Sequence, residues 1–430
     1  MKNISNPLRM RIDPDKGYLG KDGWFFLGNR YDRESDQALG NHAIDDAVSA
    51  RWDQSLRYAA KVLERRSSKL IVFITPAKWS IYPDKVDRRK SAAHPSSPFH
   101  RLRENLTGSE VTFVDATAAL IEARKIADTF SPLNSHWNNF GGLVGWNELR
   151  NAIIQCCPEI SLPEVPRYEC IETVDDFNEA FNMVGLEGRN PWMRPVYAED
   201  LPTYDYLLPG YVRSVQRGER EIDLTELPVI TECSSTPNRA RALLLRDSTG
   251  NQISPFIQTG FRRVLQQQHN YEQERSFTNV LGPVKLFNPD VVIFLMTERY
   301  LIYNFLDAEY WKDANDFDLA IAGETYIWPR ELQRQSIEVF FGEKFESPEG
   351  LKLPNNDGRK RHANITLNCK TISSIQVKTA SPGAGYARSF PVNAGINEIF
   401  FTLEADMVAS EIILSAPIDY SITRIEIRCA

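Results

Sequence analysis

Four short apolar runs, far apart along the chain, constrain the fold more than any other feature of this sequence. They are Lys69–Thr75, Val111–Val114, Ala242–Leu245 and Val291–Met296. Unbroken apolar runs of this length are typical of strands that are covered on both faces in a parallel sheet. With helical segments between them, they predict a doubly wound α/β domain. Because ligands in such sheets bind beyond the carboxyl ends of the strands, functional residues are expected directly after these runs.

A different pattern begins after residue 340. Short β-prone runs alternate there with Gly, Pro and Asn, which predicts a C-terminal β-sandwich. Since 430 residues exceed the roughly 250–300 that one core can organise, we expect two domains, an α/β domain over 1–335 and the sandwich over 340–430. The β-prone runs are Ile365–Leu367, Ser374–Lys378, Glu398–Leu403, Glu411–Ser415 and Arg424–Arg428.

Three other segments of the first domain carry local signals. Residues 17–28 predict a hairpin with a Lys-Asp-Gly turn. Residues 43–66 predict a helix, because apolar residues recur there at helical spacing, with Trp52 on the apolar face. Residues 158–235, which are rich in Pro, Glu and Tyr, predict an irregular insertion near the active face.

The composition limits the classes of partner and ligand. A formal net charge of -7 offers no basic field to a phosphate backbone, so nucleic acid is not expected as a partner. The six cysteines form no CxxC pair and have no histidine at metal-ligand spacing, so no metal site is predicted. We expect free thiols; a disulfide from Cys156 or Cys157 to Cys170 is the alternative for an exported protein.

The sequence carries no recognisable targeting segment. Its longest apolar stretches fall far short of the roughly 18–20 residues that a membrane helix requires. Residues 1–11 lack the apolar region of a secretory signal. These features predict a cytoplasmic protein, or a periplasmic one if a natural leader is missing from this chain.

The third apolar run leads into a turn that contains a serine. Asp247 and Ser248 follow the run directly, and residues 255–268 predict a helix after it. A hydroxyl at a strand-to-helix turn lies at the exposed end of a sheet, close to backbone amides around residues 248–250 that can stabilise an oxyanion. This position suits a nucleophile. Helix capping by Asp247 and Ser248 is the alternative explanation of the same pattern.

A serine nucleophile needs a base, and His136 is the strongest candidate among the six histidines. It lies between short polar residues, next to Trp137 and ahead of a glycine-rich helix start. A general base must lie within hydrogen-bond reach of the hydroxyl. The hypothesis therefore requires His136 and Ser248 to meet although they are far apart in the sequence; a surface histidine is the alternative.

Five short blocks of sequence carry a resemblance to a known family. They are Gly-Lys-Asp-Gly-Trp-Phe-Phe (20–26), Thr-Pro-Ala-Lys-Trp-Ser-Ile-Tyr-Pro (75–83), Asn-Ser-His-Trp-Asn (134–138), Arg-Asp-Ser (246–248) and Thr-Glu-Arg-Tyr-Leu (297–301). In this order they resemble the SGNH-hydrolase-like domain of the alginate O-acetyltransferase family, the AlgJ/AlgX-like proteins. The resemblance spans residues 17–305 and implies an SGNH-hydrolase-like fold with an acyl-transfer site.

The resemblance implies catalytic roles for three residues. Ser248 matches the family nucleophile, and His136 matches the base in the Asp-x-His motif. Asn134 stands where the family has Asp, so an amide would orient the imidazole without supplying a negative charge. Either Asp128 or Asp115 replaces that charge, since both lie near strand ends, or the enzyme works as a dyad or is slow.

Other residues of the matching blocks are predicted to bind substrate. The two cations among them could contact an anionic or carbonyl oxygen, with Glu298 holding the arginine; a simple ion pair is the alternative. The aromatic members offer flat apolar faces to a sugar ring, with buried packing as the alternative. The predicted substrate-binding residues are Lys78, Tyr82, Trp137, Asp247, Arg299 and Tyr300.

These observations predict an O-acetyltransferase that acts on a polysaccharide or glycan precursor through an acyl-Ser248 intermediate. No cofactor is expected to stay bound; the acetyl donor would be acetyl-CoA or an acetyl group delivered by a membrane acyl-transfer partner. A carbohydrate O-acetyl esterase would use the same residues with water as acceptor. The third hypothesis is a catalytically weak glycan-binding protein, favoured by Asn134 and by a sandwich that resembles carbohydrate-binding modules in outline.

Overall fold

Two compact units interleave along the chain in the computed structural model. The first consists of 1–50, 71–268 and 293–303, and the second of 51–70, 269–292 and 304–430. This division differs from the predicted one, because two earlier segments belong to the second unit. The predicted boundary between 335 and 340 lies outside the described residues. The structure describes residues 13–42, 46–86, 97–207, 213–269, 279–303, 306–320, 326–327, 351–352, 360–369, 371, 373–380, 386–404, 411–415 and 420–429.

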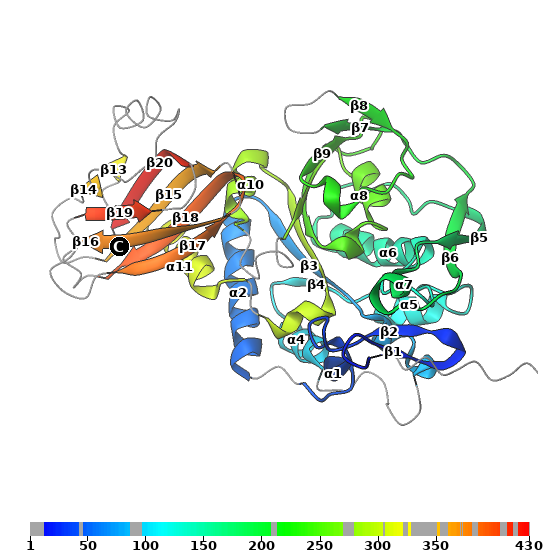
Figure 1. Ribbon diagram of the computed structural model, residues 1–430. Helices are drawn as coiled ribbons and strands as arrows, with labels where there is room; N and C mark the ends of the chain where they lie inside the picture. The colour runs from blue at the N-terminus through cyan, green and yellow to red at the C-terminus, as the bar shows by residue number, and fades with distance from the viewer. Residues whose placement is uncertain are drawn as a thin grey trace, which may run out of the picture. The chain divides into compact units, whose positions relative to one another are not determined.

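An eight-stranded mixed sheet forms the centre of the first unit (Figure 1). In sheet order its strands are β4 (Thr112–Val114), β3 (Lys69–Thr75), β12 (Val291–Thr297), β10 (Arg241–Arg246), β11 (Arg263–Gln268), β9 (Val229–Glu232), β7 (Tyr204–Leu207) and β8 (Ser214–Gln216). β3 pairs with β4, and β10 with β11, in parallel. β9 runs antiparallel to β11 and to β7, which runs antiparallel to β8. The predicted parallel α/β sheet is therefore extended by an antiparallel half.

All four predicted apolar runs are strands of this sheet. Every residue of β12 is buried, and so is every residue of β3 except Lys69. Strands that are buried throughout need cover on both faces, which explains the absence of polar alternation in these runs. The carboxyl ends of β10 and β12 lead into Asp247 and Glu298, where functional residues were expected.

Two segments differ from their predictions. Residues 158–235 are no irregular insertion, because they form β7, β8, β9, the antiparallel pair of β5 (Tyr168–Asp176) and β6 (Asn190–Tyr197), and the short helix α7 (Glu179–Val184). The helix expected over 255–268 covers only α8 (Ser254–Gly260), since β11 follows it. Pairing with β10 and β9 satisfies the backbone of β11, and these distant contacts override the local helical pattern.

The expected hairpin and long helix are both present. β1 (Gly17–Leu19) pairs antiparallel with β2 (Phe25–Leu27). The predicted helix at 43–66 is α2 (Asp46–Arg65), in which Trp52 is fully buried. None of the described helices combines the length and the apolar character needed to cross a membrane. The other helices are α1 (Glu34–Ala38), α3 (Lys78–Ile81), α4 (Pro98–Leu106), α5 (Thr117–Ala123), α6 (Asn139–Cys156), α10 (Leu281–Phe287) and α11 (Ala308–Leu319).

The second unit contains the two sheets of the C-terminal sandwich. One has the order β13-β20-β15-β18 and the other β14-β19-β16-β17, and each predicted β-prone run lies in one of these strands. Arg66, directly after α2, and Lys285 of α10 both bind the carboxylate of Glu398 within this unit. Its strands are β13 (Tyr326–Ile327), β14 (Leu351–Lys352), β15 (Arg361–Cys369), β16 (Ser373–Ala380), β17 (Ala387–Val392), β18 (Gly395–Leu403), β19 (Glu411–Ser415) and β20 (Tyr420–Cys429).

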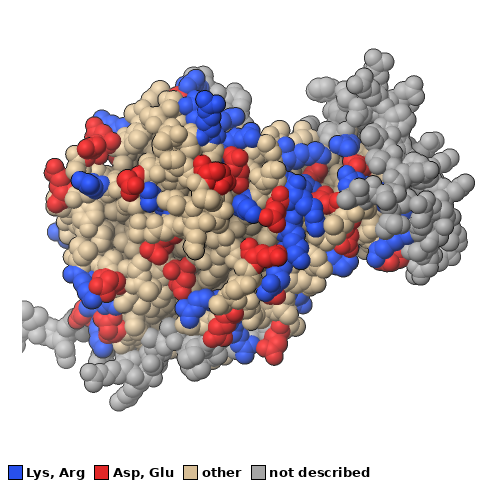
Figure 2. All heavy atoms as spheres, turned by 180° about the vertical axis from the view of Figure 1, so that it is seen from behind, with Lys and Arg blue, Asp and Glu red and all other residues tan. Residues whose placement is uncertain are grey.

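Charged side chains of both signs are distributed over the surface. On the face drawn in Figure 2, lysine and arginine side chains are interspersed with aspartate and glutamate. Such a mixed surface agrees with the formal net charge of -7, which is small for a chain of 430 residues.

Candidate active site

Ser248 and His136 lie side by side in the first unit. The Nε2 atom of His136 is 2.8 Å from the Oγ atom of Ser248, which is hydrogen-bond distance. Ser248 begins a short turn directly after β10, and His136 lies in the loop before α6. Both residues are partly exposed, so a substrate can reach them. The tertiary contact that the sequence hypothesis required is present.

Asn134 orients the imidazole of His136. Its Oδ1 atom accepts from the backbone N–H of His136 at 2.9 Å and lies 3.0 Å from Nδ1, while its Nδ2 donates to the carbonyl of Phe177 at 3.4 Å. The backbone donor and the backbone acceptor together determine which end of the amide is oxygen. Nδ1 must therefore carry the proton, which leaves the Nε2 lone pair directed at Ser248. The amide selects the tautomer that a general base needs, without adding a charge.

Trp137 joins the two loops of the site. Its indole Nε1 donates to the carbonyl of Thr249 at 2.8 Å, and its side chain is buried. Because Trp137 follows His136 and Thr249 follows Ser248, this hydrogen bond holds the imidazole and the hydroxyl next to each other. The prediction that Trp137 binds a sugar ring does not fit the structure, since its faces are covered by protein.

Asp247 also acts within the fold. Its Oδ1 accepts from the N–H of Thr249 at 2.8 Å, as the capping alternative expected, and its Oδ2 accepts from the N–H of Thr297 at 2.7 Å. Because it is buried and joins the ends of β10 and β12, it is not placed to bind substrate.

The backbone amides of the serine turn were expected to form an oxyanion hole. The N–H of Gly250 donates to the Asp247 carbonyl at 3.2 Å. The amides of Thr249 and Gly250 therefore both donate to Asp247. The third amide expected in the oxyanion hole is the N–H of Ser248.

A buried arginine supports the serine turn. Arg246 donates from Nε to Gln266 at 2.9 Å, from Nη1 to Asn251 at 2.7 Å and from Nη2 to the carbonyl of Ile222 at 2.7 Å. A Cβ atom at Gly250 would lie 2.2 Å from Arg246 Cδ, so the turn packs directly on this side chain. Burial lowers the pKa of Arg246 to about 10, which still leaves it charged at neutral pH. Sequence reasoning gave this residue no role.

Lys78 is buried, and its ammonium group is fully used by the protein. Nζ donates to the carbonyls of Phe25, Ser131, Pro132 and Asn134 at 2.6 to 2.9 Å. The side chain therefore ties the N-terminal hairpin to the loop that carries the histidine. The prediction that Lys78 contacts substrate does not fit, because no donor remains and the residue is 2% exposed.

The two predicted tyrosines are buried as well. The hydroxyl of Tyr82 donates to Asp128 at 3.1 Å and accepts from the N–H of Thr129 at 2.8 Å. The hydroxyl of Tyr300 accepts from Arg299 at 3.0 Å. Both rings are at most 1% exposed, so the packing alternative describes them and the predicted sugar contacts do not.

Arg299 lies against carboxylates other than the expected one. Its Nε is 3.5 Å from Asp32 Oδ2, and its Nη1 is 3.8 Å from Glu34 Oε2. Glu298 instead accepts from the hydroxyl of Ser80 at 2.7 Å. The expectation that Glu298 holds Arg299 is therefore wrong, and the ion-pair alternative describes Arg299, whose side chain is 14% exposed.

Neither carboxylate proposed to replace the family Asp is available to His136. Asp115 accepts from the N–H of Thr117 and pairs with an arginine of α4, and Asp128 is bound to Tyr82. A carboxylate that the sequence did not single out contacts the loop of His136: Oε2 of Glu179 accepts from the backbone N–H of Ser135 at 2.5 Å. No local pattern marks Glu179, because it lies in the segment that was predicted to be irregular.

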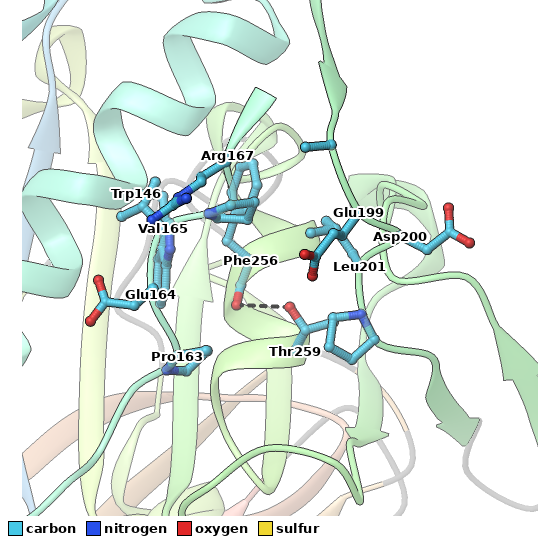
Figure 3. A pocket seen from close by; sticks show the side chains of 13 residues that line it. Trp146, Pro163, Glu164, Val165, Arg167, Glu199, Asp200, Leu201, Phe256 and Thr259 are labelled. Carbon is cyan, nitrogen blue, oxygen red and sulfur yellow. Dashed lines mark hydrogen bonds between the residues drawn. The ribbon is translucent and has the colours of Figure 1, made fainter. Parts of the chain in front are cut away.

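A separate pocket of about 360 Å³ lies beside α6 and α8 (Figure 3). Trp146 and Phe256 line it, with ring centroids 6.2 Å apart, and several charged residues stand around it. The serine and the histidine of the candidate site are not among its lining residues. The charged lining residues are Glu164, Arg167, Glu199 and Asp200.

The cysteines from Cys156 to Cys369 are free thiols. Cys156, Cys157 and Cys170 are unbridged, although the Sγ atoms of the first two are only 3.5 Å apart. The disulfide alternative is thus not present. Among the described residues, no cluster of three or more His, Cys, Asp or Glu side chains could hold a metal ion.

Comparisons with known proteins agree with this fold. The family model described as SGNH hydrolase-like domain, acetyltransferase AlgX, matches residues 18–200. A probable alginate O-acetylase AlgJ from Pseudomonas syringae pv. tomato is 25% identical over 290 residues, which are 66% of this chain and 68% of that protein. Over these residues the chain is similar to the AlgJ/AlgX-like proteins. The probable alginate O-acetylase AlgJ of Azotobacter vinelandii is 24% identical over 56% of this chain and 60% of that protein.

The likeness to AlgX extends to the sandwich. The solved structure of AlgX from Pseudomonas aeruginosa covers 96% of this chain and 94% of its own length, with a TM-score of 0.54 and 13% sequence identity. This likeness shows the fold, an SGNH-like α/β part followed by a β-sandwich, which confirms the predicted fold class apart from the antiparallel half of the sheet.

The predicted cytoplasmic location is wrong. AlgJ and AlgX, the relatives that this AlgJ/AlgX-like chain matches, are periplasmic alginate-modifying enzymes. The alternative, a periplasmic protein, is the one that agrees with these relatives.

Proposed function

We propose that this AlgJ/AlgX-like protein is a polysaccharide O-acetyltransferase that forms an acyl-Ser248 intermediate. The observation that carries the proposal is the 2.8 Å contact between His136 Nε2 and Ser248 Oγ, at an open strand end. A serine is a weak nucleophile until an adjacent base accepts its proton, and this geometry supplies that base. The names of the relatives, alginate O-acetylases, support an acidic polysaccharide as acceptor.

The reaction proceeds in two halves through one imidazole. Oγ of Ser248 attacks the acyl carbonyl while His136 Nε2 takes the hydroxyl proton; the donor's leaving group then departs with that proton. In the second half a sugar hydroxyl gives its proton to Nε2 and attacks the acyl-serine carbon, and Ser248 recovers the proton. Asn134 holds the Nδ1–H throughout, so Nε2 faces the reacting oxygen in both halves.

The oxyanion that forms in each half needs donors near Ser248. Since Thr249 and Gly250 already donate to Asp247, the N–H of Ser248 is the amide of this turn that remains for the developing charge. One such donor contributes on the order of 3 kcal/mol to transition-state stabilisation in acyl-transfer enzymes.

The acetyl group would come from a membrane acyl-transfer partner. The periplasmic location of the relatives supports this donor over acetyl-CoA, the other donor expected from the sequence. A thioester or ester at the partner would present its carbonyl to Ser248, and no cofactor would need to stay bound between turnovers.

The first prediction concerns the acyl-enzyme itself. After incubation with an activated acetyl ester, the intact protein should gain the mass of one acetyl group, on the peptide from Asp247 to Arg262 that contains Ser248. Ser248→Ala should gain none, because the attacking oxygen is absent. Intact-mass and peptide mass spectrometry provide the measurement.

The acceptor then separates the remaining hypotheses. Addition of an oligomannuronate should discharge the acyl-enzyme and yield an O-acetylated sugar. Discharge in buffer alone, without a labelled sugar, would indicate an esterase instead. An unmodified parent protein would leave only a glycan-binding role and would refute the acyl-serine proposal.

A further inference from the structure

The loop that carries the imidazole is attached to α7. The backbone N–H of Ala180 donates to the carbonyl of Leu133 at 3.0 Å, and Nδ2 of Asn134 donates to the carbonyl of Phe177. The third link is the 2.5 Å hydrogen bond from the N–H of Ser135 to Oε2 of Glu179. Three consecutive loop residues are thus bonded to the start of this helix, and Glu179 is its first residue.

Glu179 keeps its negative charge although it is partly buried. Burial would raise its pKa, but His136, the hydrogen bond from Ser135 and Arg299 together hold the pKa of Glu179 below its usual value. The carboxylate therefore lies in the field of the imidazole on one side and of the guanidinium on the other. An anion in this position stabilises the charged form of the guanidinium, and it stabilises the charged form of the imidazole when that forms.

Three other titratable groups near Glu179 carry less than a full charge near neutral pH. Burial raises the pKa of Glu34 to about 8, so that this carboxyl is largely neutral near pH 7. Burial lowers the pKa of Lys78 to about 7, although Glu179 and Glu34 oppose that change. The phenol of Tyr31, whose pKa is raised by burial, is also neutral at this pH.

We propose that Glu179 supplies the negative charge that Asn134 lacks and stabilises the imidazolium that forms on His136. The inference rests on the acyl transfer proposed above. When Oγ of Ser248 bonds to the acyl carbon, its proton passes to Nε2 and the ring becomes a cation. Asn134 then fixes the tautomer and Glu179 provides the countercharge, so two residues share the work that one aspartate performs in a Ser-His-Asp site. Glu179 is a positioning residue, since it acts through the histidine.

Glu179→Gln tests the charge while keeping the shape. The glutamine carbonyl can still accept from Ser135, so the loop should stay in place. We expect kcat/KM for an acetyl ester to fall about 10- to 100-fold and the acid limb of its pH profile to move to lower pH, because the imidazolium loses a nearby anion. Glu179→Asp, which keeps the charge but shortens the side chain, should leave the acid limb close to that of the parent.

A rescue and a matched control make the result specific. Asn134→Asp in the Glu179→Gln background should return the acid limb toward the parent value, since a carboxylate then faces Nδ1. Glu298→Gln changes another carboxyl of the same unit, one that accepts from Ser80 and not from the loop of His136, and it should leave the limb unchanged. An unchanged limb in folded Glu179→Gln would overturn the inference.

Two further measurements test the inference without turnover and without relying on Glu179→Gln alone. In Ser248→Ala, the NMR titration midpoint of the His136 ring should move to lower pH when Glu179 becomes Gln, whether or not acyl transfer occurs. If Glu179→Gln does not fold, the change in kcat/KM of Asn134→Asp in the parent protein tests the inference instead. A rise in kcat/KM of less than about 3-fold supports a charge already present, and a rise of about 100-fold contradicts it.

Discussion

At the scale of single residues, position in the site and contact with substrate are separate questions. Trp137, Asp247 and Lys78 all lie around the Ser–His pair, yet the polar atoms of each form hydrogen bonds to other groups of the protein. They determine where the imidazole and the hydroxyl stand. Short matching blocks of sequence thus mark the residues that build this site as well as those that react in it.

Lys78 offers a clear test of such a structural role. In Lys78→Met four carbonyl oxygens lose their shared donor inside the protein, so the free energy of unfolding should fall by about 3–5 kcal/mol. Urea denaturation followed by tryptophan fluorescence measures this change. Lys85→Met is the matched control, because Lys78 and Lys85 both lie over the Trp24 ring but Lys85 pairs with the exposed Asp22. This variant should cost less than about 1 kcal/mol. Equal losses would contradict the assignment.

At the scale of elements, the first turns of α6 join the two halves of the site. Asn138 caps the helix by accepting from the N–H of Gly141 at 3.0 Å. A Cβ atom at Gly141 would lie 2.3 Å from the carbonyl oxygen of Thr129, and one at Gly142 would lie 2.6 Å from that of Gln252. The helix therefore approaches the backbone on both sides, and its glycines are needed for packing.

Gly141→Ala tests how much the close approach of α6 to the backbone of Thr129 contributes to stability and activity. Alanine would favour a helix by about 1 kcal/mol over glycine, but here the new methyl group meets a backbone oxygen, and the loop with His136 must shift. We expect a net loss of about 1–3 kcal/mol and a decrease in acyl-enzyme formation. Asn151→Ala, at an exposed position of the same helix, should instead be neutral or slightly stabilising. A stabilised Gly141→Ala protein with full activity would be inconsistent with the packing described.

At the scale of the whole molecule, buried carboxyls make stability depend on pH. Burial raises the pKa of Glu298 to about 7, above the 4.5 of an exposed glutamate. Between these two values the native state holds a proton that the unfolded state has released, so stability falls as pH rises through this window. Below it both states are protonated, and above it the full cost of the buried charge is present.

Comparison with Glu298→Gln isolates this effect. The glutamine is neutral at every pH, so the parent should lose stability relative to the variant between about pH 5 and about pH 8, by at most about 3 kcal/mol. Urea midpoints of both proteins across this range give the difference. A difference that does not change with pH would show that Glu298 ionises normally in the native state.

The sequence by itself determined the four continuously apolar strands, the sandwich and the identity of the Ser–His pair. Strands buried on both faces must be continuously apolar, and that requirement is visible in a local window such as residues 291–297. The His and Ser blocks likewise carry their chemistry in a few adjacent residues. These features are local, so a pattern can predict them.

The tertiary structure alone decided which side chains are buried and which charges face the imidazole. Glu179, Arg246 and the strand β11 take their roles from segments that are distant in the sequence. Burial and Coulomb interactions depend on every element packed around a group, and a local pattern contains no information about those neighbours. For the same physical reason, Lys78 could be recognised in the sequence as a member of a matching block but not as a buried cation.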